Sequence, residues 1–147
     1  MKNDNALFYT CSLIEYIGRQ QKQKRSAVVQ YLGKDIIKRI YNYADIFHCE
    51  PIEKVADDFI NRINIPMAEF DNVGKCRYKV PDYWTIGEVY ERLIEDMAKN
   101  SDKNIIDSTM EVYLSWIDSA ISNYNTDFYY QPREYIFECY KEGEICA

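Results

Sequence analysis

The stretch KDIIKRIYNYADIFHCEPIEKVADDFINRI, residues 34–63, decides the fold class of this chain. Apolar side chains recur at steps of three and four residues before its middle and again after it, which is the spacing of one face of an α-helix. Pro51 separates the two parts, and because its nitrogen carries no proton it can begin a helix but cannot continue one. The stretch therefore predicts a helix, a corner at residues 48–51 and a second helix. The apolar positions of the two stripes are Ile36, Ile40, Tyr43, Phe47, Ile52, Val55, Ala56, Phe59, Ile60 and Ile63.

Helical spacing also extends over most of the remaining chain. Apolar stripes predict further helices up to about residue 17, over 26–32, over 86–97, over 105–121 and from Pro132 to about residue 140. Ser26 and Asp102 can each cap a following helix, and Thr85 with Glu88 has the spacing of a capping box. Prolines and a glycine interrupt the pattern over residues 64–83. The sequence predicts an all-α, single-domain bundle of six or seven helices with one long irregular loop at about residues 64–83.

The two halves of this single domain, residues 1–147, differ in charge. Residues 1–49 hold eight Lys/Arg and four Asp/Glu, whereas residues 50–147 hold ten and twenty. We therefore distinguish an N-terminal basic helical half, residues 1–63, from a C-terminal acidic and tyrosine-rich helical half, residues 84–147. A molecule with two signs of charge favours steering toward a charged partner, or pairing between its own halves.

A basic face is predicted within residues 19–39, where cationic side chains outnumber acidic ones. A short helix, a turn at Gly33 and a helix bearing Lys38 and Arg39 have the order of a helix-turn-helix hairpin, which can reach DNA phosphates. The net charge of −6 argues against a stand-alone DNA-binding protein, and a solvated surface is the alternative. The residues of this basic face are Arg19, Lys22, Lys24, Arg25, Lys38 and Arg39.

The sequence offers little enzymatic chemistry. It contains one histidine, His48, and no Gly-rich phosphate loop, nucleophile elbow or H-E-x-x-H motif. The best reactive candidate is Cys49, because a helix N-terminus stabilises a thiolate and the neighbouring imidazole can act as its base. A zinc site that includes Cys76 and a packed corner without chemistry are the other interpretations. We predict no catalytic residue, no metal and no cofactor.

The cysteine pattern indicates the compartment. Five cysteines, an odd number with no C-x-x-C pair, favour free thiols in a reducing environment. No apolar run approaches the length of a membrane span, and no signal-peptide core follows the first residues. We therefore expect a cytoplasmic protein without a membrane partner.

Tyrosine is the compositional outlier, with 14 residues. Tyrosine supplies a large contact area with few rotatable bonds, so an excess is typical of interaction surfaces. Several aromatic residues gather in the connection before the last predicted helix, where they either fold back onto the core or meet a partner. The partner-binding residues predicted there are Tyr124, Phe128, Tyr129, Tyr130, Arg133 and Tyr135, and the loop at residues 66–83 is a second candidate patch.

Three segments resemble a small bacterial family of unknown function whose members are often encoded beside ADP-ribosyltransferase-like toxins. They are LFYTCSLIEY at residues 7–16, V-V-x-Y-L at residues 28–32 and IYNYADIFH at residues 40–48. The resemblance is carried by apolar spacing together with Glu15, Tyr16 and His48. It implies a helical accessory or antitoxin-like protein rather than an enzyme, with another protein, such as a toxin, as its partner.

The leading hypothesis is a cytoplasmic protein–protein interaction module, antitoxin-like or accessory, within a bacterial conflict system. A nucleic-acid-binding regulator that uses the basic face over residues 19–39 is the second hypothesis, although we expect any DNA binding to be weak and without sequence selectivity. A cysteine-dependent enzyme is the third.

Overall fold

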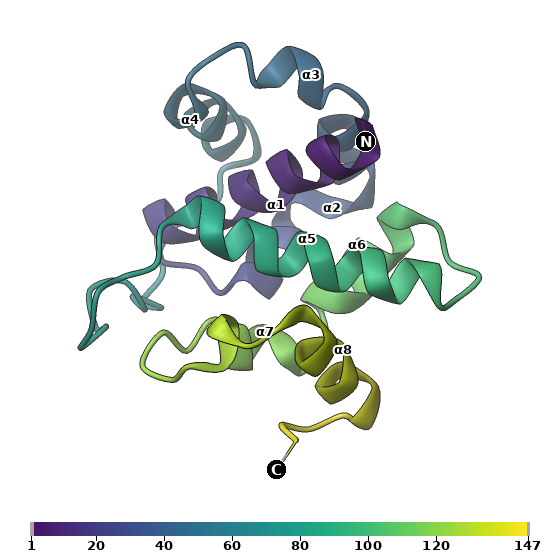
Figure 1. The fold of residues 1–147 in the computed structure, drawn as a ribbon. Helices are drawn as coiled ribbons and strands as arrows, with labels where there is room; N and C mark the ends of the chain where they lie inside the picture. Colours follow the sequence, from purple (N-terminus) through teal and green to yellow (C-terminus); the bar gives the residue numbers. More distant parts are fainter. Residues whose placement is uncertain (1, 147) are drawn as a thin grey trace.

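Helix α1 (Lys2–Gln21) runs through the middle of the molecule (Figure 1). In this computed structural model, which describes residues 2–146 and side chains from residue 5 onward, Cys11, Leu13, Ile14 and Ile17 of α1 have no exposed surface. Helix α1 packs most extensively against α5 (Tyr83–Lys99), and also against α2 (Arg25–Asn42), α3 (Ala44–Phe47) and α4 (Ile52–Ile63). The chain is therefore organised around α1, and residues 34–63 pack onto one side of it.

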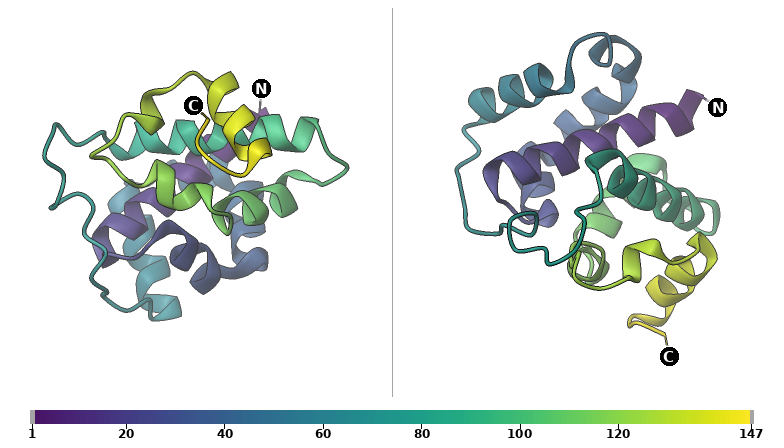
Figure 2. Two further views of the ribbon diagram at one scale, coloured as in Figure 1. Left: turned by 90° about the horizontal axis from the view of Figure 1, so that it is seen from below. Right: turned by 60° about the vertical axis from the view of Figure 1, so that its left-hand side comes forward.

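The remaining elements pack against α5, α2 and one another. They are α6 (Ile105–Tyr113), α7 (Ile117–Ile121), the 3-10 turn η1 (Phe128–Tyr130) and α8 (Arg133–Glu142). Figures 1 and 2 show α3 and α4 at one end of the molecule, α7 and α8 at the opposite end, and α1 with α5 between them. The all-α prediction is confirmed. Among the described residues, no helix has both the length and the apolar content needed to cross a bilayer.

The described part of the chain forms eight α-helices instead of the six or seven predicted. The helix predicted before the corner is interrupted at Tyr43, so that α2 ends at Asn42 and α3 is a separate short helix. The stripe predicted over 105–121 is split because the Ser115 hydroxyl donates to the Val112 carbonyl at 2.7 Å and accepts from the Ile117 amide at 3.3 Å. These bonds end α6 and begin α7. Conversely, the two helices predicted on either side of Gly33 are joined as α2 with a kink, because Gly33 has φ 79° and ψ 162°. A side chain disfavours that positive φ, which glycine adopts readily.

The corner at residues 48–51 is confirmed. Pro51 has φ −56° and ψ 139° and directly precedes α4. The irregular loop is confirmed as well, and it packs against the turn between α1 and α2. The amides of Ala68 and Phe70 donate to the carbonyls of Gln21 and Lys22, both at 2.8 Å. The first part of the loop is therefore bound to the turn between α1 and α2.

Three predicted helix starts are wrong, because the residue expected to cap each helix is not the residue that precedes it. Helix α5 is capped by Asp82, whose carboxylate accepts from the Thr85 amide at 2.8 Å, so Thr85 lies inside the helix. Helix α6 is capped by Asn104 and not by Asp102. Ser26 lies inside α2, and its amide donates to the carboxylate of Asp118 in α7 at 3.1 Å. The predicted start after Pro132 is confirmed.

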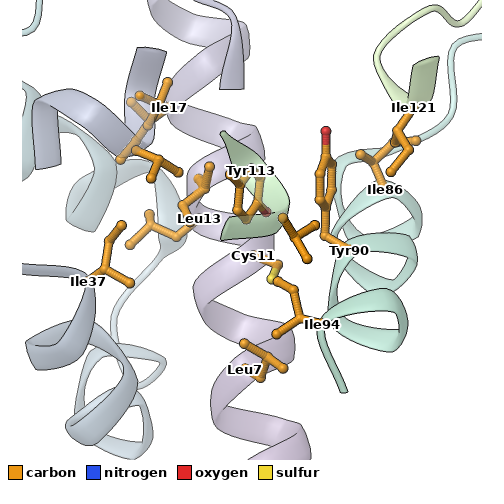
Figure 3. Packing of buried hydrophobic residues seen from close by; sticks show 14 of the residues in the cluster. Leu7, Cys11, Leu13, Ile17, Ile37, Ile86, Tyr90, Ile94, Tyr113 and Ile121 are labelled. Atoms are coloured by element: carbon orange, nitrogen blue, oxygen red, sulfur yellow. The ribbon is translucent and has the colours of Figure 1, made fainter. Parts of the chain in front are cut away.

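A close approach between α1 and α5 explains why these two helices form the central pair. A Cβ atom on Gly87 would lie 2.3 Å from Ser12 Oγ and 2.9 Å from Ser12 Cα. Glycine therefore allows the two backbones to come together at this crossing. Figure 3 shows Leu7 and Cys11 of α1 beside Ile94 of α5. Next to them the rings of Tyr90 and Tyr113 stack, with centroids 4.2 Å apart.

Candidate functional site

A groove lined by aromatic side chains lies where the first half of α1 meets the end of α2, α3 and the start of α5. Its volume is about 480 Å³. We call it the aromatic groove and define it by its ring-bearing residues Phe8, Tyr9, Tyr41, His48 and Trp84. Each of its walls comes from a different part of the chain, so the groove exists only in the folded protein.

Small residues open the space between these rings. Ala6 of α1 and Ala44 of α3 both line the groove. Trp84 is the second residue of α5, two positions after the Asp82 cap. It is 37% exposed, and its ring centroid lies 5.4 Å from that of Phe8. A tryptophan left this exposed next to a hollow is unusual in a core and is typical of a binding surface.

Tyr9 brings an unsatisfied polar group to the wall of the groove. The side chain is 6% exposed, and its hydroxyl has no hydrogen-bond partner in the described part of the chain. Burial, and then the charge of Glu50, raise the pKa of Tyr9 to about 12, so the hydroxyl is neutral and able to donate at neutral pH. A buried donor without an acceptor costs roughly 1–3 kcal/mol. An occupant that offers an acceptor after a small adjustment of the wall would recover part of that cost.

Further along α1 than the groove residues Phe8 and Tyr9, the helix carries a buried carboxylate, Glu15, which pairs with two arginines. Arg25 Nε and Nη2 donate to Glu15 Oε1 and Oε2 at 2.8 and 2.9 Å, and Arg19 Nε donates to Oε2 at 2.8 Å. The Tyr124 hydroxyl donates to the same oxygen. Burial alone would raise the pKa of Glu15, but the charge and hydrogen bonds of Arg25, and then the charge of Arg19, lower it to about 2. We call these four residues the Glu15 cluster.

The Glu15 cluster joins distant segments and positions the start of α5. Arg25 also donates to the side-chain oxygen of Asn72 at 3.0 Å, and Asn72 donates to the Ser122 carbonyl at 2.9 Å. Arg19 Nη2 donates to the Pro81 carbonyl at 2.7 Å. Pro81 precedes the Asp82 cap, so this bond holds the chain from which Trp84 projects. With Glu15 and Arg25 fully buried, the cluster is a structural centre.

The predicted basic face is wrong for two of its six residues. Arg25 is fully buried and Arg19 largely so, because both turn inward onto Glu15. Lys22 lies 3.9 Å from Asp71. Lys24, Lys38 and Arg39 are exposed, and none of them forms a salt bridge among the described residues. Four of the six cations therefore stay exposed, which leaves a smaller basic face than predicted, and the nucleic-acid hypothesis stays a prediction.

The predicted partner surface before α8 is wrong for Tyr124, Phe128 and Tyr129, which are 3%, 4% and 9% exposed. They fold back onto the core because the Tyr124 hydroxyl donates to Glu15 and the Tyr129 ring packs edge-on against that of Tyr124. Tyr130, by contrast, is 77% exposed.

The last two residues of that predicted surface, Arg133 and Tyr135, form hydrogen bonds within the chain. Arg133 donates to Asp96 at 2.9 Å and to Glu95 at 3.3 Å. The half-buried Tyr135 donates to the Cys146 carbonyl at 2.6 Å.

His48 and Cys49 are both exposed, but only His48 lines the aromatic groove. Helix α4 begins at Ile52, so Cys49 stands apart from the first amides of that helix, and its Sγ lies 3.4 Å from the Asp45 carbonyl. Among the described residues, no three His, Cys, Asp or Glu side chains gather in a way that would hold a metal ion.

The thiols should differ sharply in reactivity. Cys11 and Cys139 are fully buried, and burial raises the pKa of Cys11. We expect iodoacetamide at pH 7 to label Cys49 first, no faster than a free thiol, and to leave Cys11 and Cys139 unlabelled until the protein unfolds. Peptide mass spectrometry of timed samples measures this order. Fast labelling of Cys49 at acid pH would contradict the expectation and support the cysteine-dependent enzyme.

Comparisons with protein-family models, with curated proteins and with solved structures find no significant match. The resemblance of residues 7–48 to a family encoded beside toxins therefore stays a prediction. Sequence reasoning missed the aromatic groove, although the available signal was the pair Phe8 and Tyr9 beside Ala6. Two of the three segments that carry the resemblance, 7–16 and 40–48, supply most of its lining.

Proposed function

We propose that this protein is a protein–protein interaction module that takes a segment of another protein into the aromatic groove. The observation that supports this proposal is the groove itself, an open hollow of about 480 Å³ with a half-exposed tryptophan and an unsatisfied buried hydroxyl. Its volume is within the range of roughly 300–1,000 Å³ that is typical of binding pockets. Large aromatic side chains at the centre of an interface commonly contribute most of its binding energy.

The surroundings favour a protein as the occupant. The groove is lined mainly by apolar atoms, with Asp45 at its edge and Glu50 close enough to affect Tyr9. Negative charge at this position and a net charge of −6 repel nucleic acid. The resemblance of residues 7–48 makes a toxin the class of partner to test first. All five cysteines are free thiols, which is compatible with a cytoplasmic role in a reducing compartment.

A peptide selection tests the proposal and does not require an identified partner. A random 16-residue display library is selected on the wild-type protein, and the enriched peptides are measured by fluorescence polarisation on three variants. Ala6→Trp fills the groove, Trp84→Ala removes part of its wall, and Tyr130→Ala removes an exposed aromatic side chain outside it. We expect binding to weaken at least about tenfold on the first two variants and to stay unchanged on the third.

Thermal melts serve as the control, because only variants that keep the wild-type unfolding temperature within a few degrees report on binding. Peptides that bind Ala6→Trp and Trp84→Ala as tightly as the wild type would place the interaction elsewhere and refute the proposal. A library that yields no enriched peptide would refute it as well. If the enriched sequences match a segment of this chain, the partner is a second copy.

A further inference from the structure

Four aromatic rings form a continuous strip that leads out of the groove along α1. The Phe8 ring contacts Trp84 at 5.4 Å, Trp84 contacts Tyr83 at 4.8 Å, and Tyr83 meets Tyr16 edge-on at 5.3 Å. All four side chains are partly or well exposed. We call these residues the aromatic strip. It presents several ring faces and edges to one region of solvent.

Exposed carboxylates border the aromatic strip. Asp82 directly precedes Tyr83, and α4, which packs beside α1, carries Glu53 and Asp57 one turn apart. Burial, and then the charges of Glu53 and Asp57, raise the pKa of Tyr16. Burial and then Glu53 also raise the pKa of Tyr83. The negative charge of Glu53 therefore acts on both tyrosine side chains of the strip.

Among the described residues, neither Glu53 nor Asp57 forms an ion pair with a cation. Lys54 lies between Glu53 and Asp57 in sequence, but it pairs with Glu50 at 3.2 Å and Asp58 at 3.6 Å. The cations that lie over rings elsewhere, such as Arg62 over Phe59 at 5.7 Å, involve none of the four strip residues. Partly exposed rings beside unpaired carboxylates leave a site that is complementary to a cation.

We propose that the partner segment carries an arginine that stacks on the aromatic strip and pairs with Glu53 or Asp57. This inference builds on the proposed function, because it names the chemistry of the segment that enters the neighbouring groove. A guanidinium is planar and weakly hydrated, so it stacks on aromatic faces and forms two parallel hydrogen bonds with a carboxylate. Lysine offers only a compact, strongly hydrated charge, and we expect it to bind more weakly.

The test uses peptides selected on the wild-type protein and synthesised again with each arginine replaced by glutamine. We expect one arginine-to-glutamine change to weaken binding to the wild-type protein roughly tenfold, the size of one partly desolvated cation–ring and ion-pair contact. On the double variant Glu53→Gln, Asp57→Asn, where the rings remain but the carboxylates are absent, the same change should weaken binding only about two- to fivefold, the size of an exposed cation–ring contact alone. Asp58→Asn is the matched control, since Asp58 is also exposed on α4 but pairs with Lys54, and it should behave as the wild type.

The outcomes separate the inference from the proposed function. Suppose that a selected peptide binds Ala6→Trp weakly but binds the wild type equally well with arginine or glutamine. The inference about arginine would then be refuted, and the proposed function would stand. An arginine effect of equal size on the wild type and on the double variant would also refute it. Selected peptides that bind Ala6→Trp as tightly as the wild type would refute both proposals.

Discussion

The Glu15→Gln variant should lose about 3–5 kcal/mol of unfolding free energy, because it removes the charge that compensates two buried arginines. Arg25 is fully buried and donates two hydrogen bonds to Glu15, at 2.8 and 2.9 Å, and Arg19 donates a third. A glutamine is neutral and accepts at one oxygen only, so both guanidiniums would lose their counter-charge and some of their N–H groups would lose an acceptor. Urea unfolding at pH 7 measures this loss.

The control is an ion pair at the surface. Lys103 and Glu111 pair at 2.5 Å, with both side chains well exposed, so Glu111→Gln should change stability little, as exposed ion pairs do. Equal losses in Glu15→Gln and Glu111→Gln would contradict the structural role of the Glu15 cluster.

The difference between the wild type and Glu15→Gln should depend on pH in a defined direction. The folded-state pKa of Glu15 is about 2, below its ordinary value of 4.5. A carboxyl with a lowered pKa contributes its full stability above the unfolded value and loses it as the pH falls toward the folded value. The loss caused by Glu15→Gln should therefore be constant above about pH 5 and shrink between pH 4.5 and 2. Burial raises the pKa of Asp118, so the contribution of this carboxyl to stability has the opposite pH dependence. That contribution is the same in both proteins and cancels in the difference between them.

The second large effect is expected for Gly87→Val, which should lose about 2–3 kcal/mol of unfolding free energy through overpacking. A Cβ at this position would lie 2.9 Å from both the Cα and the nitrogen of Ser12. Backbone atoms of α1 cannot rotate away as a side chain can, so the two helices would have to move apart. Since α1 with α5 is the most extensive helix pair of the fold, that separation would loosen the whole core.

Two further variants check the cause of the Gly87→Val effect. Glu88→Ala changes an exposed neighbour on the same helix, and it should stay within about 0.5 kcal/mol of the wild type. Gly87→Ala should be less destabilising in a Ser12→Gly background, because the nearest clashing atom, Ser12 Oγ at 2.3 Å, is then absent. Wild-type stability for Gly87→Val in chemical denaturation would show that the close approach does not matter.

Local signals in the sequence predicted most helices, the corner and the loop. The spacing of apolar residues reflects the helix period, and Pro51 lacks an amide proton, so both features act within a few residues of the chain. The wrong helix starts are local errors of another kind. Asp82 and Asn104 were better placed to cap than Thr85 and Asp102, and short-range preferences do not decide between neighbouring candidates.

The site could not be predicted because it depends on contacts between distant segments. Tyr124 meets Glu15 across 109 positions of sequence, and this contact turned a predicted surface tyrosine into a core residue. The aromatic groove joins Phe8, His48 and Trp84, which have no fixed spacing. One usable signal was present. Glu15 lies within the apolar run of residues 13–17 and four positions before Arg19, a pattern that indicates a buried ion pair.

Hydrogen–deuterium exchange of the protein with a selected peptide bound tests the interaction site most directly. Slower amide exchange is expected in peptic fragments that cover residues 5–9, 41–48 and 83–88, which supply the aromatic groove and the start of α5. Fragments that cover residues 124–135 should exchange at the same rate with and without peptide. Protection confined to residues 124–135, with the groove fragments unchanged, would contradict the assignment of the aromatic groove as the binding site.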